Sequence, residues 1–467
     1  MLARIGQELS GFFRTTAPDP FVIAVLLTAL TAVLALLFGS AGLGAGELLD
    51  VWQGGLWNLL AFSMQMCLIL VTGHALAASP PVARGIGWLA SRAGSVRAGV
   101  VIVSVSAMLA GLVNWGFGLV VGAILAREVA KSLGARGIVA PAGLLAAAGY
   151  VTMVAWHGGL SGSAPLAAAN AEGQARILGE QLSAEVGVIE TTATLFSTLN
   201  LVATGGLLVI VPLLLVLMCP PRPRKSDRPR KSEEQVSVHK VEEIQARALG
   251  DEGEGQGVVP RWLERSPVVA WGLGIAMVVW LGSAFVERGA AMLDLNSAIL
   301  LMFASGLLLH GSARGYADAV TEGATGCAGI IVQFPLYGGI MAMMMQSGLA
   351  GSLSAWFVEV AGESEGALAL LTFVSAGLVN LFVPSGGGQW AVQAPIAMQA
   401  AVDTGANPAR LVMAVAYGDQ LTNMLQPFWA LPLLAITRAR VQDVVAYTVV
   451  VMVAAGAWLA LCLWLVG

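Results

Sequence analysis

Two ionisable side chains, Asp419 and His157, lie inside long apolar stretches of this 467-residue chain. A buried acid in an apolar span is costly and usually marks an ion or proton pathway. Asp419 is the only acid in the middle of a span, and we expect it to carry a proton or to bind a coupling cation. The alternative is a structural acid bonded to neighbouring helix N-termini. His157 is expected either to carry protons or to stay neutral and bonded to backbone.

Short polar residues and glycines form four clusters around these two residues. Half-helix N-termini suit an anion such as a carboxylate, whereas half-helix C-termini and unwound carbonyl groups suit a cation. The residues expected to bind substrate are Asn114, Trp115, Gly116, Ser161, Ser163, Asn380, Ser385, Gly386, Gly387, Thr422 and Asn423. Those expected to bind the coupling ion are Asp419, His157, Gly418, Asn114 and Asn380. The simpler alternative is that these glycines and serines only let membrane helices pack closely.

Two stretches of the chain carry the same landmarks. The tetrapeptide Gly-Leu-Val-Asn ends at Asn114 and again at Asn380, an offset of 380 − 114 = 266 residues. Tyr150 and Tyr417 repeat at nearly the same offset, 417 − 150 = 267. Polar breaks at matching places in two halves are typical of secondary transporters built from repeats. Close packing explains single glycines but not two sets at matching offsets.

The composition is that of a membrane protein. Hydrophobic residues make up 57% of the chain and charged residues 11%, against about 25% charged in soluble domains. Several runs reach the roughly 20 apolar residues that cross a bilayer core. We therefore expect an all-α, multi-pass protein of the inner membrane, with the lipid bilayer and a small carboxylate as partners. No nucleic-acid partner, no cofactor and no metal is expected beyond the coupling ion, which is sodium or a proton.

Basic residues indicate the topology, because cytoplasmic loops are enriched in Lys and Arg. Arg4 and Arg14 place the N-terminus in the cytoplasm, and the last span then leaves the C-terminus in the periplasm. The expected domains are a first membrane repeat at 1–218, a cytoplasmic polar linker at 219–265, a linking transmembrane helix at 266–290 and an inverted second repeat at 291–467. The linker is expected to be mostly disordered, with a short helix near 233–249.

Each repeat is expected to contain a re-entrant helical hairpin and a broken transmembrane helix. The first hairpin reverses at Asn114, and its arms of about 12–15 residues are too short to cross the bilayer. The predicted hairpins are 98–126 and 366–401, and the predicted broken helices are 138–169, interrupted at 157–163, and 410–437, interrupted at 418–423. Other spans are predicted at 20–38, 56–78, 195–218, 267–286, 295–310 and 324–346, followed by one at the C-terminus. Since non-helical backbone at membrane depth survives only against protein or a wet cavity, the four breaks are expected to meet near the midplane.

Several segments resemble the short-chain fatty acid transporter family (AtoE type), over almost the whole chain except the linker. They are Pro18-Asp-Pro20, Trp57-Asn-Leu-Leu-Ala-Phe62, Asn114-Trp-Gly-Phe-Gly-Leu-Val-Val-Gly122, Val383-Pro-Ser-Gly-Gly-Gly388, Ala416-Tyr-Gly-Asp-Gln420 and Gln426-Pro-Phe-Trp-Ala-Leu-Pro432. The resemblance implies carriage of small monocarboxylates such as butyrate or acetoacetate across the bacterial inner membrane. Asp419 stands where this family usually has glutamate, which keeps the charge. His157 stands where glycine is usual, which bears on substrate preference or pH dependence.

More distantly, the chain is similar to the ion-transporter superfamily, whose members pair two hairpins with two broken helices. Many of them are elevator-type dimers, which implies a homodimer and an elevator mechanism here. Four tryptophans flank the breaks, and we expect them either to wall an apolar part of the substrate or to pack as wedges: Trp115, Trp156, Trp390 and Trp429.

Other functions fit parts of the sequence less well. The string Gly159-Leu-Ser-Gly162 carries the nucleophile in intramembrane serine proteases, but that chemistry needs a histidine base within reach of Ser161 and leaves the second half's breaks unexplained. A channel fits poorly because four convergent breaks suit occlusion. A transporter of another small anion, such as a dicarboxylate or an amino-acid derivative, is the closer alternative. No Lys or Arg lies in a span centre to clamp a second carboxylate, so we expect a transporter of small monocarboxylates and not an enzyme.

Overall fold

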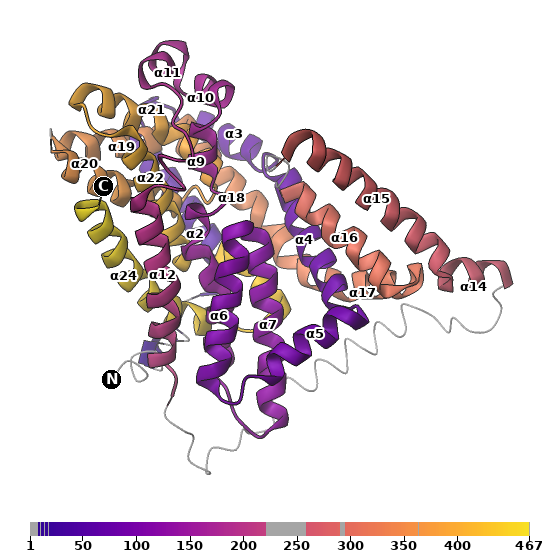
Figure 1. The fold of residues 1–467 in the computed structure, drawn as a ribbon. Helices are drawn as coiled ribbons and strands as arrows, with labels where there is room; N and C mark the ends of the chain where they lie inside the picture. The colour runs from indigo at the N-terminus through magenta and orange to yellow at the C-terminus, as the bar shows by residue number, and fades with distance from the viewer. Residues whose placement is uncertain are drawn as a thin grey trace.

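The computed structural model describes residues 8–9, 11–13, 15–16, 18–220, 258–289, 295–362 and 364–466. Every regular element within these ranges is a helix, which confirms the predicted all-α fold (Figure 1). Seven helical segments in this part of the chain are long and apolar enough to cross a membrane. The helix predicted near 233–249 and most of the polar linker lie outside the described residues.

The first half begins with α2 (Pro20–Phe38), which Asp19 caps by accepting a 2.9 Å hydrogen bond from the Phe21 amide. The next helices are α3 (Ala45–Gly55), α4 (Leu60–Ala78), α5 (Pro80–Ser91), α6 (Val96–Val113) and α7 (Trp115–Ala135). The first broken helix consists of α8 (Ala142–Tyr150), the 3-10 turns η1 (Val151–Val154) and η2 (Trp156–Gly158), and α9 (Ser163–Ala168). The half closes with α10 (Ala171–Leu178), α11 (Glu180–Val186) and α12 (Thr198–Leu217).

The second half follows α14 (Val258–Arg265) and α15 (Pro267–Arg288). It contains α16 (Leu295–His310), α17 (Ala313–Ala324), the turn η4 (Thr325–Cys327), α18 (Ala328–Gln346) and α19 (Leu349–Ala361). The second hairpin is α20 (Glu365–Asn380) with α21 (Gly386–Thr404). The second broken helix is α22 (Pro408–Thr422), η5 (Asn423–Leu425) and α23 (Pro427–Thr437), and α24 (Val441–Leu465) is the last helix.

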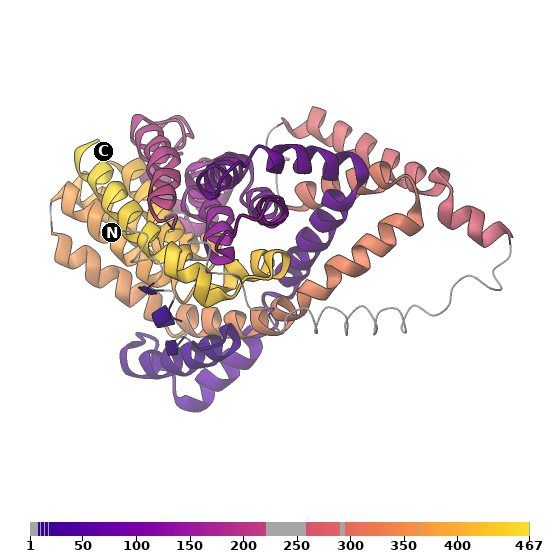
Figure 2. The ribbon, with the colours of Figure 1, turned by 90° about the horizontal axis from the view of Figure 1, so that it is seen from below.

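Both halves share an order of elements, namely a helix, two consecutive helices, a short helix, a hairpin, a broken helix and a final long helix, but α10 and α11 of the first half have no counterpart in the second. The opposite membrane direction of the halves stays a prediction. The two broken helices contact each other, and each is packed against its own hairpin. Helices α4 and α17 pack together and connect this core with α15 and α16, which project to one side (Figure 2).

The arms of the first hairpin are longer than predicted. Helix α6 has 18 residues and α7 has 21, or roughly 27–32 Å at 1.5 Å per residue. Helix α7 continues beyond Arg127 because Glu128 pairs with both Arg127 (3.0 Å) and Lys131 (2.9 Å) along its surface. The expectation of short arms was therefore wrong. The chain reverses at the single extended residue Asn114 (φ −153°, ψ 127°).

Two spans predicted as single helices are longer in the structure. Helix α3 precedes α4 and α17 precedes α18, which gives helical segments of 34 residues each at 45–78 and 313–346. The segment between the first broken helix and α12 contains α10 and α11, which were not predicted. These additions share a cause, because helices of mixed composition lack the long apolar run by which spans are recognised in a sequence.

Both interruptions of the broken helices are displaced from the predicted positions. The first begins at Val151 and not at His157, and the second begins at Asn423 and not at Gly418. Gly418 lies inside α22, where an added Cβ would meet the Phe373 carbonyl oxygen at 2.3 Å and the Gly377 nitrogen at 2.8 Å. The glycine therefore permits close packing of α22 on α20 and does not end the helix.

We expect Gly418→Ala to destabilise the protein by about 1–3 kcal/mol, because its methyl group would overlap the backbone of α20. Thermal unfolding of the purified protein in detergent measures the effect. The matched control is Gly205→Ala inside α12, where no described atom lies within 4 Å of the added Cβ and the better helix propensity of alanine should hold or raise the unfolding temperature. Equal unfolding temperatures for the two variants would show that α20 and α22 are not packed as described.

Candidate functional site

The side chain of Asn114 holds the tip of the first hairpin. Its Oδ1 accepts hydrogen bonds from the amides of Gly116 (3.0 Å) and Phe117 (3.1 Å), so Asn114 caps α7. The intervening amide of Trp115 donates to the Ser161 hydroxyl at 3.1 Å. The first hairpin tip is therefore bonded directly to the break in the first broken helix.

Asn380 bonds the second hairpin to the second break. Its Nδ2 group donates to the Asp419 carbonyl (2.8 Å), the Thr422 hydroxyl (2.9 Å) and Asn423 Oδ1 (2.8 Å). Its own carbonyl accepts from Gln426 Nε2 at 2.6 Å. These bonds satisfy polar groups at the end of α22 that have no partner within the helix.

Two tyrosines at matching positions connect the halves. Tyr150 donates to the carbonyl groups of Asn423 (2.7 Å) and Gln426 (3.1 Å) in the second break. Tyr417 donates to Asn200 Oδ1 on α12 at 3.0 Å. Each tyrosine hydroxyl thus forms a hydrogen bond with the other half of the chain. The tyrosine that is repeated in the sequence therefore has the same structural role in both halves.

The two ionisable residues meet where the broken helices touch. His157 Nδ1 lies 3.4 Å from Asp419 Oδ1, and the side chains are 0% and 2% exposed. His157 Nε2 accepts a hydrogen bond from the Ala164 amide at 3.1 Å, so the proton of the neutral ring is on Nδ1 and faces the carboxylate. The 3.4 Å separation is longer than a good hydrogen bond. Asp419 Oδ2 has no hydrogen-bond partner among the described residues, which leaves this carboxyl group poorly satisfied.

The tip of the second hairpin lies against the same place. An added Cβ on Gly386 would be 3.0 Å from both the His157 and Trp156 rings and 3.2 Å from Ser163 Oγ. Gly387, in contrast, has no described atom within 4 Å of its Cβ position. Only a residue without a side chain lets the hairpin backbone come this close to the first break.

Seven aromatic side chains form a cluster that reaches both breaks: Phe62, Trp115, Trp156, Phe334, Tyr337, Phe428 and Trp429. The Trp115 ring centroid lies 6.2 Å from that of Trp156 and 5.0 Å from that of Trp429. Trp156 also stacks on the His157 ring at 4.1 Å. The aromatic cluster therefore extends from helices α4 and α18 to the His157–Asp419 contact. Trp390, also predicted to wall the site, has no ring contact with the cluster among the described rings.

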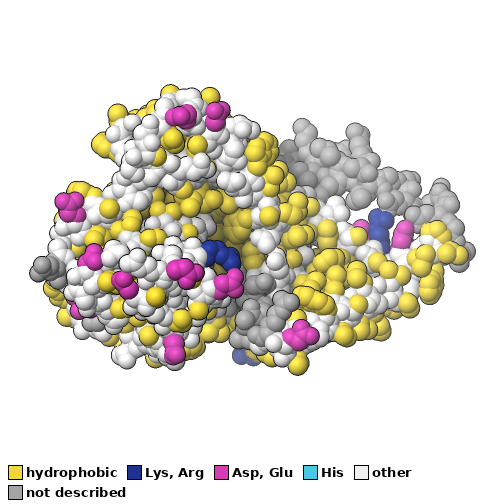
Figure 3. Space-filling view, turned by 90° about the horizontal axis from the view of Figure 1, so that it is seen from above, with side chains coloured by type: hydrophobic (Ala, Val, Ile, Leu, Met, Phe, Trp, Pro, Cys, Tyr) yellow, Lys and Arg dark blue, Asp and Glu magenta, His cyan; other side chains and the backbone are white. Residues whose placement is uncertain are grey.

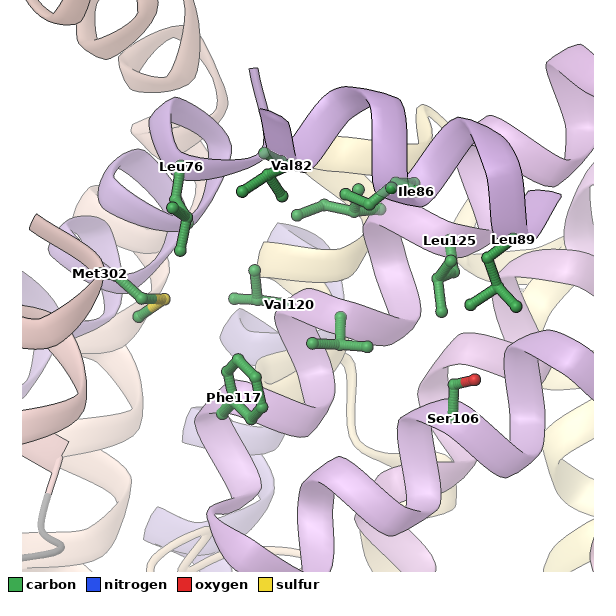
Figure 4. Close-up of a pocket in the computed structure, with 14 residues that line it drawn as sticks. Leu76, Val82, Ile86, Leu89, Ser106, Phe117, Val120, Leu125 and Met302 are labelled. Carbon is green, nitrogen blue, oxygen red and sulfur yellow. The ribbon is translucent and has the colours of Figure 1, made fainter. Parts of the chain in front are cut away.

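Cavities border the first hairpin. One of about 660 Å³ is lined by Asn114 and Phe117 together with α15 and α16. A neighbouring one of about 350 Å³ is apolar, and side chains of α4, α5 and α7 point into it, among them Phe117 and Val120 (Figure 4). A third, of about 950 Å³, lies between α11, α19 and α21 and includes Glu185 and Asp403. The face that carries α10 and α11 is hollowed, with hydrophobic side chains around the hollow (Figure 3).

The structure brings most of the predicted residues into one bonded group but separates the two hairpin asparagines. Asn114 binds amides of its own hairpin, whereas Asn380 binds the end of α22. Ser385 caps α21 by accepting from the Gly388 amide at 3.2 Å. No group of three or more His, Cys, Asp or Glu side chains in the described ranges is placed to hold a metal ion.

Several members of the group were not singled out as site residues from the sequence: Tyr150, Asn200, Gln420, Gln426, Phe62, Phe334 and Phe428. Gln420, for example, accepts a 3.0 Å hydrogen bond from the His157 amide. The sequence offered a signal for some of them. Tyr150 is one of the two repeated tyrosines, and Gln420 and Gln426 lie in segments that resemble the short-chain fatty acid transporter family. Nothing in the sequence pointed to Asn200 or Phe334.

Interrupted helices bonded to one another inside an apolar bundle, with a buried carboxyl group between them, are the features of a multi-pass membrane transporter. Comparison with known proteins agrees with that class. The chain belongs to the short-chain fatty acid transporter family, whose model matches residues 1–466.

Two relatives carry the name "Putative short-chain fatty acid transporter". The one from Escherichia coli (strain K12) is 38% identical over 462 residues, which cover 98% of each chain. The one from Haemophilus influenzae (strain ATCC 51907 / DSM 11121 / KW20 / Rd) is 36% identical over 453 residues, 97% of each chain. Both are named as transporters and not as enzymes, in agreement with the expectation from the sequence.

Two solved structures align over 96% of this chain and 97% of their own. They are Neisseria gonorrhoeae MtrF, described among antimetabolite efflux pumps, with 17% identity and a TM-score of 0.43, and the Alcanivorax borkumensis YdaH transporter, with 16% identity and a TM-score of 0.42.

We expect Asn380→Ala to lower stability by about 1–3 kcal/mol, since it leaves buried acceptors at the end of α22 without a donor. Thermal unfolding in detergent measures this loss. The control is Asn170→Ala, which removes an exposed cap from the short α10 and should leave the unfolding temperature of the bundle unchanged. An Asn380→Ala variant as stable as the Asn170→Ala variant would mean that these bonds do not hold the second break.

Proposed function

We propose that this protein is a secondary transporter that carries small monocarboxylates, such as butyrate or acetoacetate, across the bacterial inner membrane together with a proton. The family and the names of its relatives support the substrate class. The observation that carries the coupling is the buried contact between His157 and Asp419, which joins the two broken helices.

The geometry of this contact favours a proton over sodium. A hard cation is bound by several oxygen atoms. Here Asp419 Oδ1 instead faces the Nδ1–H group of His157, whose other nitrogen is held by the Ala164 amide. His157 cannot take up a second proton without losing the Ala164 bond, so Asp419 is the group that gains and loses the transported proton, and His157 positions it.

Coupling then follows from charge. A substrate carboxylate bound at the first break lies near Asp419, and two anions in an apolar site repel strongly. The ionised form of Asp419 is therefore disfavoured when substrate is bound, so binding of the anion and binding of a proton support each other. An unprotonated complex is therefore disfavoured, which links proton binding to substrate binding.

The movement that we propose is of the elevator type. The hairpins and broken helices form one bonded group, and α4 and α16 to α18 lie beside it. The bonded group would move as a unit against these helices, within a homodimer whose N-termini are cytoplasmic and whose C-termini are periplasmic. A transporter of another small organic anion remains the second candidate, because the hydrogen-bonding groups of the breaks do not by themselves select butyrate.

Uptake of labelled butyrate into proteoliposomes, with proton and sodium gradients imposed separately, tests the proposal. We expect uptake above that of protein-free liposomes under an inward proton gradient, and no stimulation by sodium. Protein-free liposomes are essential because butyric acid crosses lipid unaided. Stimulation by sodium alone would overturn proton coupling, and no uptake from folded protein under either gradient would overturn the substrate class.

We expect Asp419→Asn to abolish proton-driven accumulation while counter-exchange of labelled for unlabelled butyrate continues, because the amide cannot titrate but keeps the shape of the side chain. The control is Asp403→Asn, an exposed acid on α21 that should leave both activities unchanged. If Asp419→Asn lost exchange and accumulation equally while folding normally, its role in coupling would be refuted.

A further inference from the structure

The aromatic cluster contains two buried hydrogen-bond donors without a partner. The indole nitrogens of Trp156 and Trp429 have no hydrogen-bond partner among the described residues, and the side chains are only 3% and 5% exposed. An unpaired buried donor of this kind costs roughly 1–3 kcal/mol. Trp458, in contrast, donates to the Ala203 carbonyl at 2.9 Å, whereas the Trp52 indole nitrogen is also without a partner among the described residues.

The chemistry of these donors defines the ligand that would satisfy them. An indole N–H can only donate, so its partner must be an acceptor. Trp156 belongs to the first break and Trp429 to the first turn of α23, beyond the second break, and both rings contact Trp115 at the tip of the first hairpin. The two N–H donors come from the two halves of the chain, and their rings contact the same Trp115 ring. A carboxylate has two acceptor oxygens and could therefore accept from both.

We propose that the indole N–H groups of Trp156 and Trp429 bind the carboxylate of the substrate, and that Phe62, Phe334 and Phe428 contact its alkyl chain. This inference rests on the proposed function and names the site at which it acts. Phe334 and Phe428 stack at 3.9 Å, and Phe62 stacks on both at 5.9 and 6.3 Å, so three apolar rings lie next to the donors, with Tyr337 against Phe428. A short alkyl chain is matched by such surroundings and a second carboxylate is not.

The position of the donors links this site to the coupling residues. Trp156 stacks on His157, whose ring faces Asp419, so a carboxylate bound by the Trp156 indole is close to the Asp419 carboxyl group. The shared neighbour Trp115 belongs to the first turn of α7. Movement of that hairpin tip would uncover both indoles together, which makes Trp115 the cover of the closed site.

The test is binding of labelled butyrate to the purified full-length protein in nanodiscs, compared for wild type, Trp156→Phe and Trp429→Phe. Phenylalanine keeps an aromatic ring but removes the N–H donor. We expect each variant to bind butyrate at least roughly 10-fold more weakly, as loss of a hydrogen bond to a charged group predicts. Binding of 1-butanol, which shares the chain but lacks the carboxylate, should change little. Trp390→Phe is the matched control, since Trp390 is equally buried but lies outside the cluster.

A second measurement needs no substitution. In wild-type protein labelled with ¹⁵N at the indole nitrogens, two indole N–H resonances should shift on addition of butyrate and none on addition of 1-butanol. Unchanged butyrate affinity in both phenylalanine variants, or no indole shift in a protein that binds butyrate, would overturn this site and leave the transport function standing. A wild-type protein that binds no butyrate would overturn the substrate class and this site with it.

Discussion

Backbone amide and carbonyl groups that leave a helix inside an apolar bundle must find partners within the protein, and the arrangement of this molecule follows from that constraint. Each of the four interruptions exposes such groups, and side chains from other parts of the chain bond several of them. Asn380 donates a hydrogen bond to a carbonyl near the end of α22, and Tyr150 donates to a carbonyl in the turn η5. Ser161 accepts a hydrogen bond from the first amide of α7. The interruptions are therefore stable only when they are together, which forces two halves far apart in sequence into one core.

The need to pair buried polar groups also explains how a binding site arises. Groups that the protein bonds internally are structural, as the bonds of the Asn380 Nδ2 group show. Among the buried groups without a partner in the described residues are a carboxyl oxygen of Asp419 and the indole N–H donors of Trp156 and Trp429, and such groups are available to a ligand. His157 lies between two of them, because its ring contacts Asp419 and stacks on Trp156. A proton and a carboxylate can thus bind within one small region and influence each other through charge.

The sequence predicted the helical class, the position of most spans and the four interruptions, because long apolar runs and repeated polar clusters are local signals. It misplaced the break near Gly418, since a glycine that ends a helix and a glycine that lets two helices touch look alike without the neighbouring helix. It grouped Asn114 with Asn380 by symmetry, although their partners are different. It could not show that His157 meets Asp419, because 262 residues separate them and only the folded halves bring them together.

The central claim is that proton and carboxylate bind as a linked pair at the His157–Asp419 contact. The most direct measurement is the number of protons taken up when butyrate binds, from calorimetric titrations of purified protein in buffers of different ionisation enthalpy. The account predicts an uptake that approaches about one proton per butyrate in the wild type, and none in Asp419→Asn. Butyrate binding without proton uptake in the wild type, or equal uptake in both proteins, would contradict it.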